Sequence, residues 1–294
     1  MNVKNTLLVT EFQRFCMRDG PGVRTTVFLK GCPLDCVWCH NPEMKKVGQE
    51  ILFDKNKCLN CGGCIAVCEN GAHLIKGEHL FDRNKCKLCF NCVGVCSTNA
   101  LEILGEQKSI SEIVEVVKRD VAFYGEKGGV TLSGGEPLMQ GEVVVKLLKA
   151  LKEEGLNTAV ETCGNVDTNI LKKAVEYVDL FLWDIKDTDN IRHKKYTGVS
   201  NELILKNLSV INEMNAKIRL RCILVNGVNT NATHYKNLLN IARKIKNLDG
   251  VEIIPYHAYG GSKALLIGLN DNGIEDWIPT SEQLFEANSI LKNK

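Results

Sequence analysis

The cysteines are the feature that most limits what this chain can fold into. Eleven of its 14 cysteines fall into three closely spaced sets. No apolar run reaches the roughly 18 residues of a membrane helix, and residues 1–5 open no signal peptide, so we expect a cytoplasmic protein. Disulfides are rare in that compartment, where clustered cysteines are more often metal ligands. The three sets therefore predict loops folded around inorganic centres.

The first set follows residues 23–29, a run rich in β-branched and aromatic side chains that predicts a strand. It consists of Cys32, Cys36 and Cys39. A 4Fe–4S cluster normally takes four thiolates, so three leave one iron open to another ligand. An open coordination position is typical of a catalytic metal site. The alternative is a zinc site completed by His40, which would need an awkward chelate of two adjacent ligands.

Residues 54–105 carry two further sets, which repeat one another at an interval of 28 residues. Both have the spacing Cys-x2-Cys-x2-Cys-x3-Cys of bacterial two-cluster ferredoxins, in which the fourth cysteine ligates the other cluster. The usual proline after the fourth cysteine is replaced by Glu69 and Ser97. Two zinc sites would also use eight ligands but would leave the repeat unexplained. The expected 4Fe–4S ligand sets are Cys58, Cys61, Cys64 and Cys96 for one cluster, and Cys86, Cys89, Cys92 and Cys68 for the other.

After residue 105 the sequence alternates strand-like and helix-like stretches, and Ser109 is expected to cap a helix that runs to residue 123. Together with residues 23–29, the predicted strands are residues 130–133, 158–162, 180–185, 217–225 and 251–256. A βαβ pattern of this kind predicts a parallel sheet with right-handed crossovers. A closed barrel needs eight strands, so six predict a partial (β/α)6 TIM-type barrel. A short apolar run at residues 6–12 predicts an edge strand.

The predicted organisation is therefore α/β, with two domains. The partial barrel takes residues 1–49 and 106–294, and an inserted α+β ferredoxin-like domain with two 4Fe–4S clusters takes residues 50–105.

Polar motifs follow the predicted strands at their C-terminal ends, where the loops of βα barrels build active sites. The paired glycines Gly134 and Gly135 allow backbone to approach a ligand closely. Alternation along a strand puts Asp184 and Lys186 on one face, where an acid and a base can hold a zwitterion. A solvated strand end is the alternative for any single motif, but the ordered series favours a site. The remaining candidates are Glu136, Glu161, Thr162 and His257 at strand ends, and Arg221 on the predicted strand 217–225.

The cysteine triplet, with Trp38 before its third cysteine, resembles the signature of the radical S-adenosylmethionine (SAM) superfamily. The segments DGPGVRT (residues 19–25), FLKGC (28–32) and CHNPE (39–43) are similar to those of the glycyl-radical-enzyme activating enzymes. This resemblance implies reductive cleavage of SAM to methionine and a 5′-deoxyadenosyl radical. That radical then abstracts a Cα hydrogen from the C-terminal glycine loop of a partner glycyl radical enzyme.

The resemblance also implies the cofactors and their contacts. It assigns catalysis to the cluster on the triplet and adds SAM and a monovalent cation near Glu161 and Thr162. With the two inserted clusters, three 4Fe–4S clusters are expected. The implied SAM-binding residues are Trp38, Cys39, His40, Gly134, Gly135, Glu136, Glu161, Thr162, Asp184, Lys186, Arg221 and His257.

Flavodoxin or ferredoxin is the expected electron donor, and the inserted clusters would relay its electrons or support the partner interface. The formal charge of +2, without clustered Lys and Arg, argues against a nucleic-acid partner, and no membrane partner is expected. A radical SAM enzyme acting on a small molecule would leave residues 19–25 and His257 unexplained. An electron carrier would leave the barrel motifs unexplained and would not produce 5′-deoxyadenosine. Four histidines lie in no motif and are interpreted as surface or packing residues: His73, His79, His193 and His234.

Overall fold

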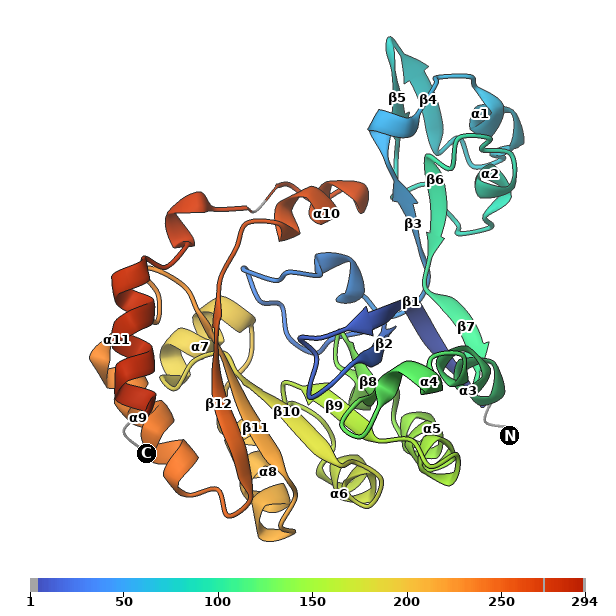
Figure 1. The fold of residues 1–294 in the computed structure, drawn as a ribbon. Helices are drawn as coiled ribbons and strands as arrows, with labels where there is room; N and C mark the ends of the chain where they lie inside the picture. Colours follow the sequence, from blue (N-terminus) through green and yellow to red (C-terminus); the bar gives the residue numbers. More distant parts are fainter. Residues whose placement is uncertain (1–4, 272, 293–294) are drawn as a thin grey trace.

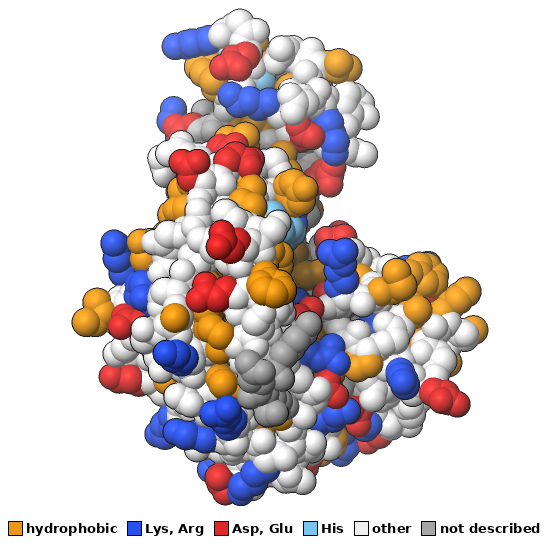
Figure 2. Space-filling model, turned by 60° about the vertical axis from the view of Figure 1, so that its left-hand side comes forward, with side chains coloured by type: hydrophobic (Ala, Val, Ile, Leu, Met, Phe, Trp, Pro, Cys, Tyr) orange, Lys and Arg blue, Asp and Glu red, His pale blue; other side chains and the backbone are white. Residues whose placement is uncertain are grey.

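The computed structural model describes residues 5–271 and 273–292 (Figure 1). The expectation that residues 1–5 open no signal peptide therefore lies almost entirely outside the described residues. Within them, no helix is both long and apolar enough to cross a membrane. Figure 2 shows a small lobe standing on a larger body, with basic and acidic side chains interspersed over the visible face.

An eight-stranded sheet forms the larger body, in the order β12-β11-β10-β9-β8-β2-β1-β7. Its six parallel strands are β2 (Arg24–Leu29), β8 (Gly129–Gly134), β9 (Thr158–Thr162), β10 (Leu180–Ile185), β11 (Ile218–Leu224) and β12 (Leu248–Pro255). The sheet curves in Figure 1, and β12 and β7 are its two unpaired edges. The prediction of a largely parallel sheet is confirmed, and the open edges fit a partial barrel.

The strand at the N-terminal end does not lie at the edge. β1 (Thr6–Cys16) pairs antiparallel with β2 on one side and with β7 (Glu106–Ser109) on the other. The expectation of an edge strand at residues 6–12 is therefore wrong. The sequence Glu-Gln-Lys-Ser of β7 has no apolar alternation, so nothing in its pattern indicated that it would pair beyond β1.

Helices cover the outer face of the parallel strands, and the lowest part of Figure 1 shows this layer clearly. They are α3 (Ile110–Lys118), α4 (Val121–Tyr124), α5 (Glu142–Glu153), α6 (Thr168–Val175), α8 (Glu202–Glu213), α9 (Ala232–Arg243) and α11 (Ser281–Lys292). Two further helices, α7 (Asn190–Thr197) and α10 (Gly260–Leu266), lie instead at the C-terminal ends of the strands, against the loop that follows β2. Short 3-10 turns are η1 (Pro42–Met44), η2 (Lys55–Lys57), η3 (Pro137–Gln140) and η4 (Glu275–Trp277).

The predicted helix after Ser109 is shorter than expected. Ser109 and Glu112 form a capping box that starts α3, as the sequence indicates. The helix then ends at Lys118, and α4 begins beyond Asp120. Asp120 is buried and accepts hydrogen bonds from Arg14 and from Thr25 (2.6 Å), which ties the break to the sheet. These hydrogen bonds to distant segments interrupt the helix at Asp120, although the apolar spacing of the sequence predicts that it continues.

Residues 50–105 form the lobe above the larger body. Two antiparallel pairs build it: β3 (Glu50–Phe53) with β6 (Leu101–Leu104), and β4 (His73–Lys76) with β5 (Glu78–Phe81). The two short helices α1 (Gly63–Val67) and α2 (Asn91–Gly94) lie beside these strands. The 28-residue repeat relates β3 to β5 and β4 to β6, so each pair joins one strand from either half of the repeat.

Candidate active site

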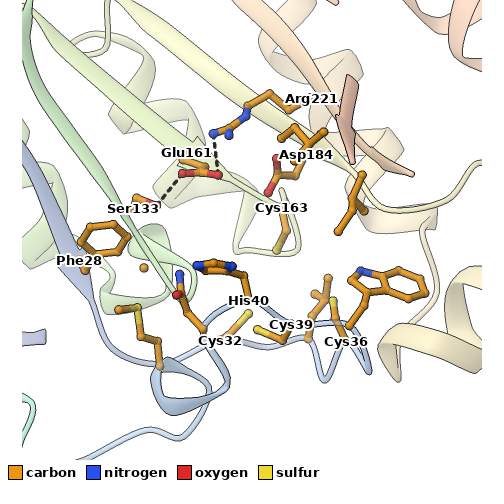
Figure 3. A pocket seen from close by; sticks show the side chains of 18 of the residues that line it. Phe28, Cys32, Cys36, Cys39, His40, Ser133, Glu161, Cys163, Asp184 and Arg221 are labelled. Carbon is orange, nitrogen blue, oxygen red and sulfur yellow. Dashed lines mark hydrogen bonds and ion pairs between the residues drawn. The ribbon is translucent and has the colours of Figure 1, made fainter. Parts of the chain in front are cut away.

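The C-terminal ends of the parallel strands surround one cavity of about 510 Å³. Parallel strands bring their carboxyl ends to the same edge of a sheet, so side chains distant in sequence meet there. Figure 3 shows the loop that carries Cys32, Cys36 and Cys39 on one side of this cavity. Glu161, Asp184 and Arg221 lie on the opposite side, on strands of the sheet.

Backbone hydrogen bonds fix the cysteine loop at both ends. Cys32 N–H donates to Lys45 O (2.9 Å), and Val37 N–H donates to Tyr196 O (3.0 Å). Trp38 is buried and packs against the Tyr196 ring, with centroids 5.6 Å apart. The three cysteines are therefore held by the body of the protein rather than by an exposed, free loop.

The spread of the triplet distinguishes a cluster from a single ion. Tetrahedral zinc, with Zn–S bonds of about 2.3 Å, would bring its thiolates to within about 4 Å of one another. Among the described residues, no three ligand atoms from Cys32, Cys36, Cys39 and His40 all lie within 4.8 Å of one another. A 4Fe–4S cluster keeps its thiolates further apart, because iron and sulfide lie between them. This spread disfavours the zinc alternative for the triplet.

The paired glycines form the wall of the cavity next to the cysteine loop. Gly134 has φ +115°, and a Cβ there would lie 2.2 Å from Leu29 O. A Cβ on Gly135 would lie 2.2 Å from Gly31 O. The end of β8 therefore approaches the end of β2 and the start of the loop too closely for any side chain.

We expect Gly134→Ala to destabilise the protein by about 3 kcal/mol, because the positive φ and the overlap with Leu29 O both oppose it. Chemical denaturation of the anaerobically reconstituted protein measures this. Gly48→Ala is the matched control, since Gly48 has φ +94° but no atom within 4 Å of an added Cβ. Gly48→Ala should lower the free energy of unfolding by about 1 kcal/mol. Equal losses of unfolding free energy in the two variants would show that the contact between residue 134 and Leu29 O does not exclude a side chain.

Glu161, Arg221 and Ser133 form a charged network on the strand side of the cavity. Arg221 Nη1 lies 2.7 Å from Glu161 Oε1, and Ser133 Oγ donates to Glu161 Oε2 at 2.6 Å. Burial raises the pKa of Glu161, and the Arg221 guanidinium opposes this shift. Burial lowers the pKa of Arg221, but the carboxylates around it, Glu161 first, raise it further, so the guanidinium stays charged. The network offers both a fixed cation and a fixed anion to a ligand.

A second pair of opposite charges lies on β10. Lys186 Nζ donates to Asp184 Oδ2 at 2.8 Å, so the two side chains share a face as strand alternation predicts. Both side chains line the cavity. Burial lowers the pKa of Lys186, but Asp184 and then Cys36 raise it by more, and the ammonium is retained. Together with Glu161 and Arg221, this pair suits a zwitterionic group.

Two histidines face each other across the rim. His40 follows the cysteine triplet, and His257 follows β12. Their Nδ1 atoms are 3.4 Å apart and the rings meet edge to face. Both line the cavity. The structure thus brings the cysteine loop and the last strand into contact, although 217 residues separate the two rings in sequence.

Two expected contacts do not line the cavity. Glu136 is fully buried and accepts hydrogen bonds from Thr162 Oγ1 and from Cys163 N–H, both at 2.8 Å. Adjacent residues of a strand point to opposite faces, so Glu161 and Thr162 cannot both face the same ligand. Glu136 and Thr162 instead fix the turn after β9. Any effect on SAM would pass through the residues they hold in place.

Other lining residues had no role assigned from the sequence. Asp19 lines the cavity, and its carboxylate accepts a hydrogen bond from Thr26 Oγ1 at 2.7 Å. It lies in the DGPGVRT segment, which is the signal that could have identified it. Cys163 is buried beside Cys32 and also lines the cavity. Lys263 on α10 donates to Asn41 Oδ1 at 2.6 Å, and no motif marks it.

The lobe has two small hollows, each lined by four cysteines. The first hollow is lined by Cys58, Cys61, Cys64 and Cys96. The second hollow is lined by Cys68, Cys86, Cys89 and Cys92. Each hollow thus takes three cysteines from one run and the fourth from the other.

Comparison with known proteins places this geometry in a family. Residues 83–248 match the radical SAM superfamily, and residues 18–80 match a 4Fe–4S single cluster domain. The choline trimethylamine-lyase activating enzyme of Oleidesulfovibrio alaskensis is 43% identical over 274 residues, which are 90% of this chain and 88% of the relative. The chain belongs to the glycyl-radical-enzyme activating enzymes of the radical SAM superfamily. As a member of this family, it is an enzyme that uses SAM and an iron–sulfur cluster to activate a glycyl radical enzyme.

Further relatives support the same family. The trans-4-hydroxy-L-proline dehydratase activating enzyme of Clostridioides difficile is 39% identical and covers 97% of this chain and 96% of its own. Among solved structures, a radical SAM methyltransferase from Sphaerobacter thermophilus has a TM-score of 0.53 at 14% identity, covering 92% of this chain and 64% of the other. This structural similarity concerns the fold alone.

Proposed function

We propose that this enzyme cleaves SAM reductively to methionine and a 5′-deoxyadenosyl radical, which abstracts a Cα hydrogen from a partner glycine. The partner is a glycyl radical enzyme that presents this glycine on a C-terminal loop. One observation carries the proposal. The cysteine triplet and two partly buried pairs of opposite charge face one cavity at the strand ends.

The residues of the cavity suit the parts of SAM. When bound by Cys32, Cys36 and Cys39, a 4Fe–4S cluster supplies the electron that SAM cleavage requires. Asp184 and Lys186 present opposite charges to the zwitterionic methionine end. Arg221 and Glu161 present a second pair, and Gly134 and Gly135 bring backbone close to the methionine amino group.

The other end of the ligand would lie towards the histidines. His40 and His257 form the rim at which the adenosine would be held, and the resemblance gives His257 this role. Trp38, packed between the loop and Tyr196, closes one side of the cluster site to water. The resemblance implies a monovalent cation near Glu161. Arg221 already neutralises that carboxylate, so the charges around Glu161 do not themselves require a cation.

We propose that residues 50–105 are a ferredoxin-like domain inserted into a barrel of residues 1–49 and 106–294. The two hollows, with their crossed sets of four cysteines, support two 4Fe–4S clusters, which makes three in the chain. The lobe would receive electrons from a flavodoxin or ferredoxin. The relatives act on a lyase and a dehydratase, and we propose a partner of that general kind.

Anaerobically reconstituted protein should contain about 12 iron atoms per chain, because three cysteine sets each bind four. Iron and sulfide analysis measures this directly. Air should bleach the protein as the clusters and thiolates oxidise. A value near eight, with the triplet unoccupied, would contradict the proposed catalytic site.

Deuterium transfer tests the reaction itself. A partner labelled with deuterated glycine should pass deuterium into 5′-deoxyadenosine and gain the EPR signal of a glycyl radical. Unlabelled partner supplies the control. If no glycine-loop protein or peptide accepts the radical while a free metabolite loses hydrogen to it, the activating function is wrong.

A further inference from the structure

The β4–β5 hairpin places two histidines between the hollows of the lobe. His79 on β5 lines the first hollow, and His73 on β4 lines the second. Both side chains are buried, with 3% and 4% of their surface exposed. Nδ1 of His73 lies 3.0 Å from Nε2 of His79, so the pair forms a direct link from one hollow to the other.

His79 also reaches the cysteines of the first hollow. Its Nδ1 lies 3.3 Å from Cys58 Sγ, and its Nε2 lies 3.5 Å from Cys64 Sγ. A cysteine that ligates a cluster is a thiolate, which accepts hydrogen bonds but cannot donate them. A hydrogen bond between His79 Nδ1 and Cys58 therefore requires the hydrogen on Nδ1.

The link to His73 is compatible with this assignment in either direction. His73 Nδ1–H can donate to an unprotonated Nε2 of His79, or Nε2–H of a doubly protonated His79 can donate to His73. In both arrangements His79 Nδ1–H still faces Cys58, whereas only the second also places a hydrogen on Nε2, which the Cys64 thiolate 3.5 Å away could accept. His73 itself is held by stacking on Phe81, with ring centroids 4.6 Å apart and planes 13° apart. The pair thus orients one N–H towards one cluster ligand.

The 28-residue repeat shows that this arrangement is not symmetric. The position equivalent to His79 in the other half is Ile51, and the position equivalent to His73 is Leu101. Ile51 lines the second hollow and Leu101 lines the first, so at these equivalent positions each hollow has a histidine from one half of the repeat and an aliphatic residue from the other. Within the described part of the chain, only the first hollow has a histidine nitrogen recorded in hydrogen-bond contact with its cysteine sulfurs.

We propose that His73 and His79 are positioning residues that make the two lobe clusters unequal, with His79 donating a hydrogen bond to the Cys58 thiolate. The inference rests on the proposed two-cluster lobe. Hydrogen bonds to cluster sulfurs stabilise the reduced state and raise the reduction potential. The cluster of the first hollow therefore has the higher potential of the two and holds the electron that the lobe receives.

The repeat supplies the test variants. His79→Ile and His73→Leu introduce the residues that the other half carries at the equivalent positions, so each hollow should tolerate them. The readout is an EPR-monitored potentiometric titration of anaerobically reconstituted protein, together with its iron and zinc content. His79→Ile should shift one lobe midpoint to lower potential and leave the other lobe cluster and the triplet cluster unchanged. His73→Leu should produce a smaller shift in the same direction, because His79 keeps its N–H but loses its orientation.

A rescue variant separates hydrogen bonding from packing. His79→Asn keeps an N–H donor near the position of Nδ1 and should restore most of the midpoint lost in His79→Ile. Unchanged midpoints in His79→Ile, with full iron content, would overturn the proposal and show that the pair merely packs. The ligand atoms of Cys64, His73 and His79 lie within 4.8 Å of one another and could instead hold a single ion. One bound zinc with four irons missing in the unsubstituted protein would also overturn the proposal.

These outcomes are distinct from failure of the proposed function. If SAM is not cleaved although the lobe midpoints shift as expected, the catalytic proposal fails and the histidine proposal stands. If SAM is cleaved and the iron content is full but the midpoints are unchanged, the catalytic proposal stands and the histidine proposal fails.

Discussion

Replacement of Cys36 with alanine is expected to reduce SAM cleavage to background. Cys36 belongs to the triplet that we propose as the ligands of the catalytic cluster, and two thiolates of that triplet should not retain it. Iron should fall from about 12 to about 8 atoms per chain, with the EPR signals of the lobe clusters unchanged. The measurements are the yield of 5′-deoxyadenosine from dithionite-reduced protein, iron analysis and EPR.

Cys61→Ala provides the matched control, because Cys61 belongs to the first hollow of the lobe. This variant should lose one lobe cluster but still bind SAM at the barrel. Measuring SAM binding for both variants separates the two sites. If Cys61→Ala and Cys36→Ala were equally unable to bind SAM, the division between catalytic cavity and lobe would be wrong.

Asp184→Ala and Lys186→Ala should each slow formation of the glycyl radical by about a hundredfold. The side chains form a partly buried pair at 2.8 Å, and either loss would leave an uncompensated charge where we propose that the methionine end of SAM binds. A displacement of about 1 Å at the reacting atoms is enough for a loss of this size, so partial SAM binding should not rescue the rate. Quantitative EPR of the partner measures radical formation.

The control for these variants removes an ion pair of the same length outside the cavity. Lys152 Nζ lies 2.8 Å from Asp179 Oδ1, and Lys152→Ala should leave radical formation within about twofold of the unsubstituted enzyme. A comparable loss in the control would assign the effect to stability rather than to SAM positioning. Asp184→Asn adds a second check, since it keeps the shape of the side chain and removes its charge.

The sequence predicts the parallel strands and the cavity well because both depend on local patterns. Apolar runs mark the six strands, and chain order then places their C-terminal ends together. The triplet, the paired glycines, Asp184 and Lys186 all line the cavity, as their positions after strands indicate. Those features need no knowledge of distant contacts.

Features that depend on contacts between distant segments could not be predicted in this way. The pairing of β7 with β1 follows from the path of the chain out of the lobe, and the end of α3 follows from Asp120 reaching Arg14 and Thr25. The resemblance groups Thr162 with Glu161 at the SAM site, although adjacent residues on a strand point to opposite faces. His73 and His79 lie in no sequence motif, which indicates only surface or packing roles, because only the fold of the repeat brings them to the cysteines.

The junction between lobe and barrel has an evolutionary consequence. Glu50, at the start of the lobe, pairs directly with Leu104 at its end, and partners in an antiparallel ladder have Cα atoms only about 5 Å apart. Glu50 is also tied to the strand before the cysteine loop by a 2.7 Å ion pair with the buried Lys30. Deleting the whole lobe would therefore leave two adjacent chain ends that a short turn can join. An ancestor could gain or lose this module in a single insertion or deletion without changing the order of any barrel strand.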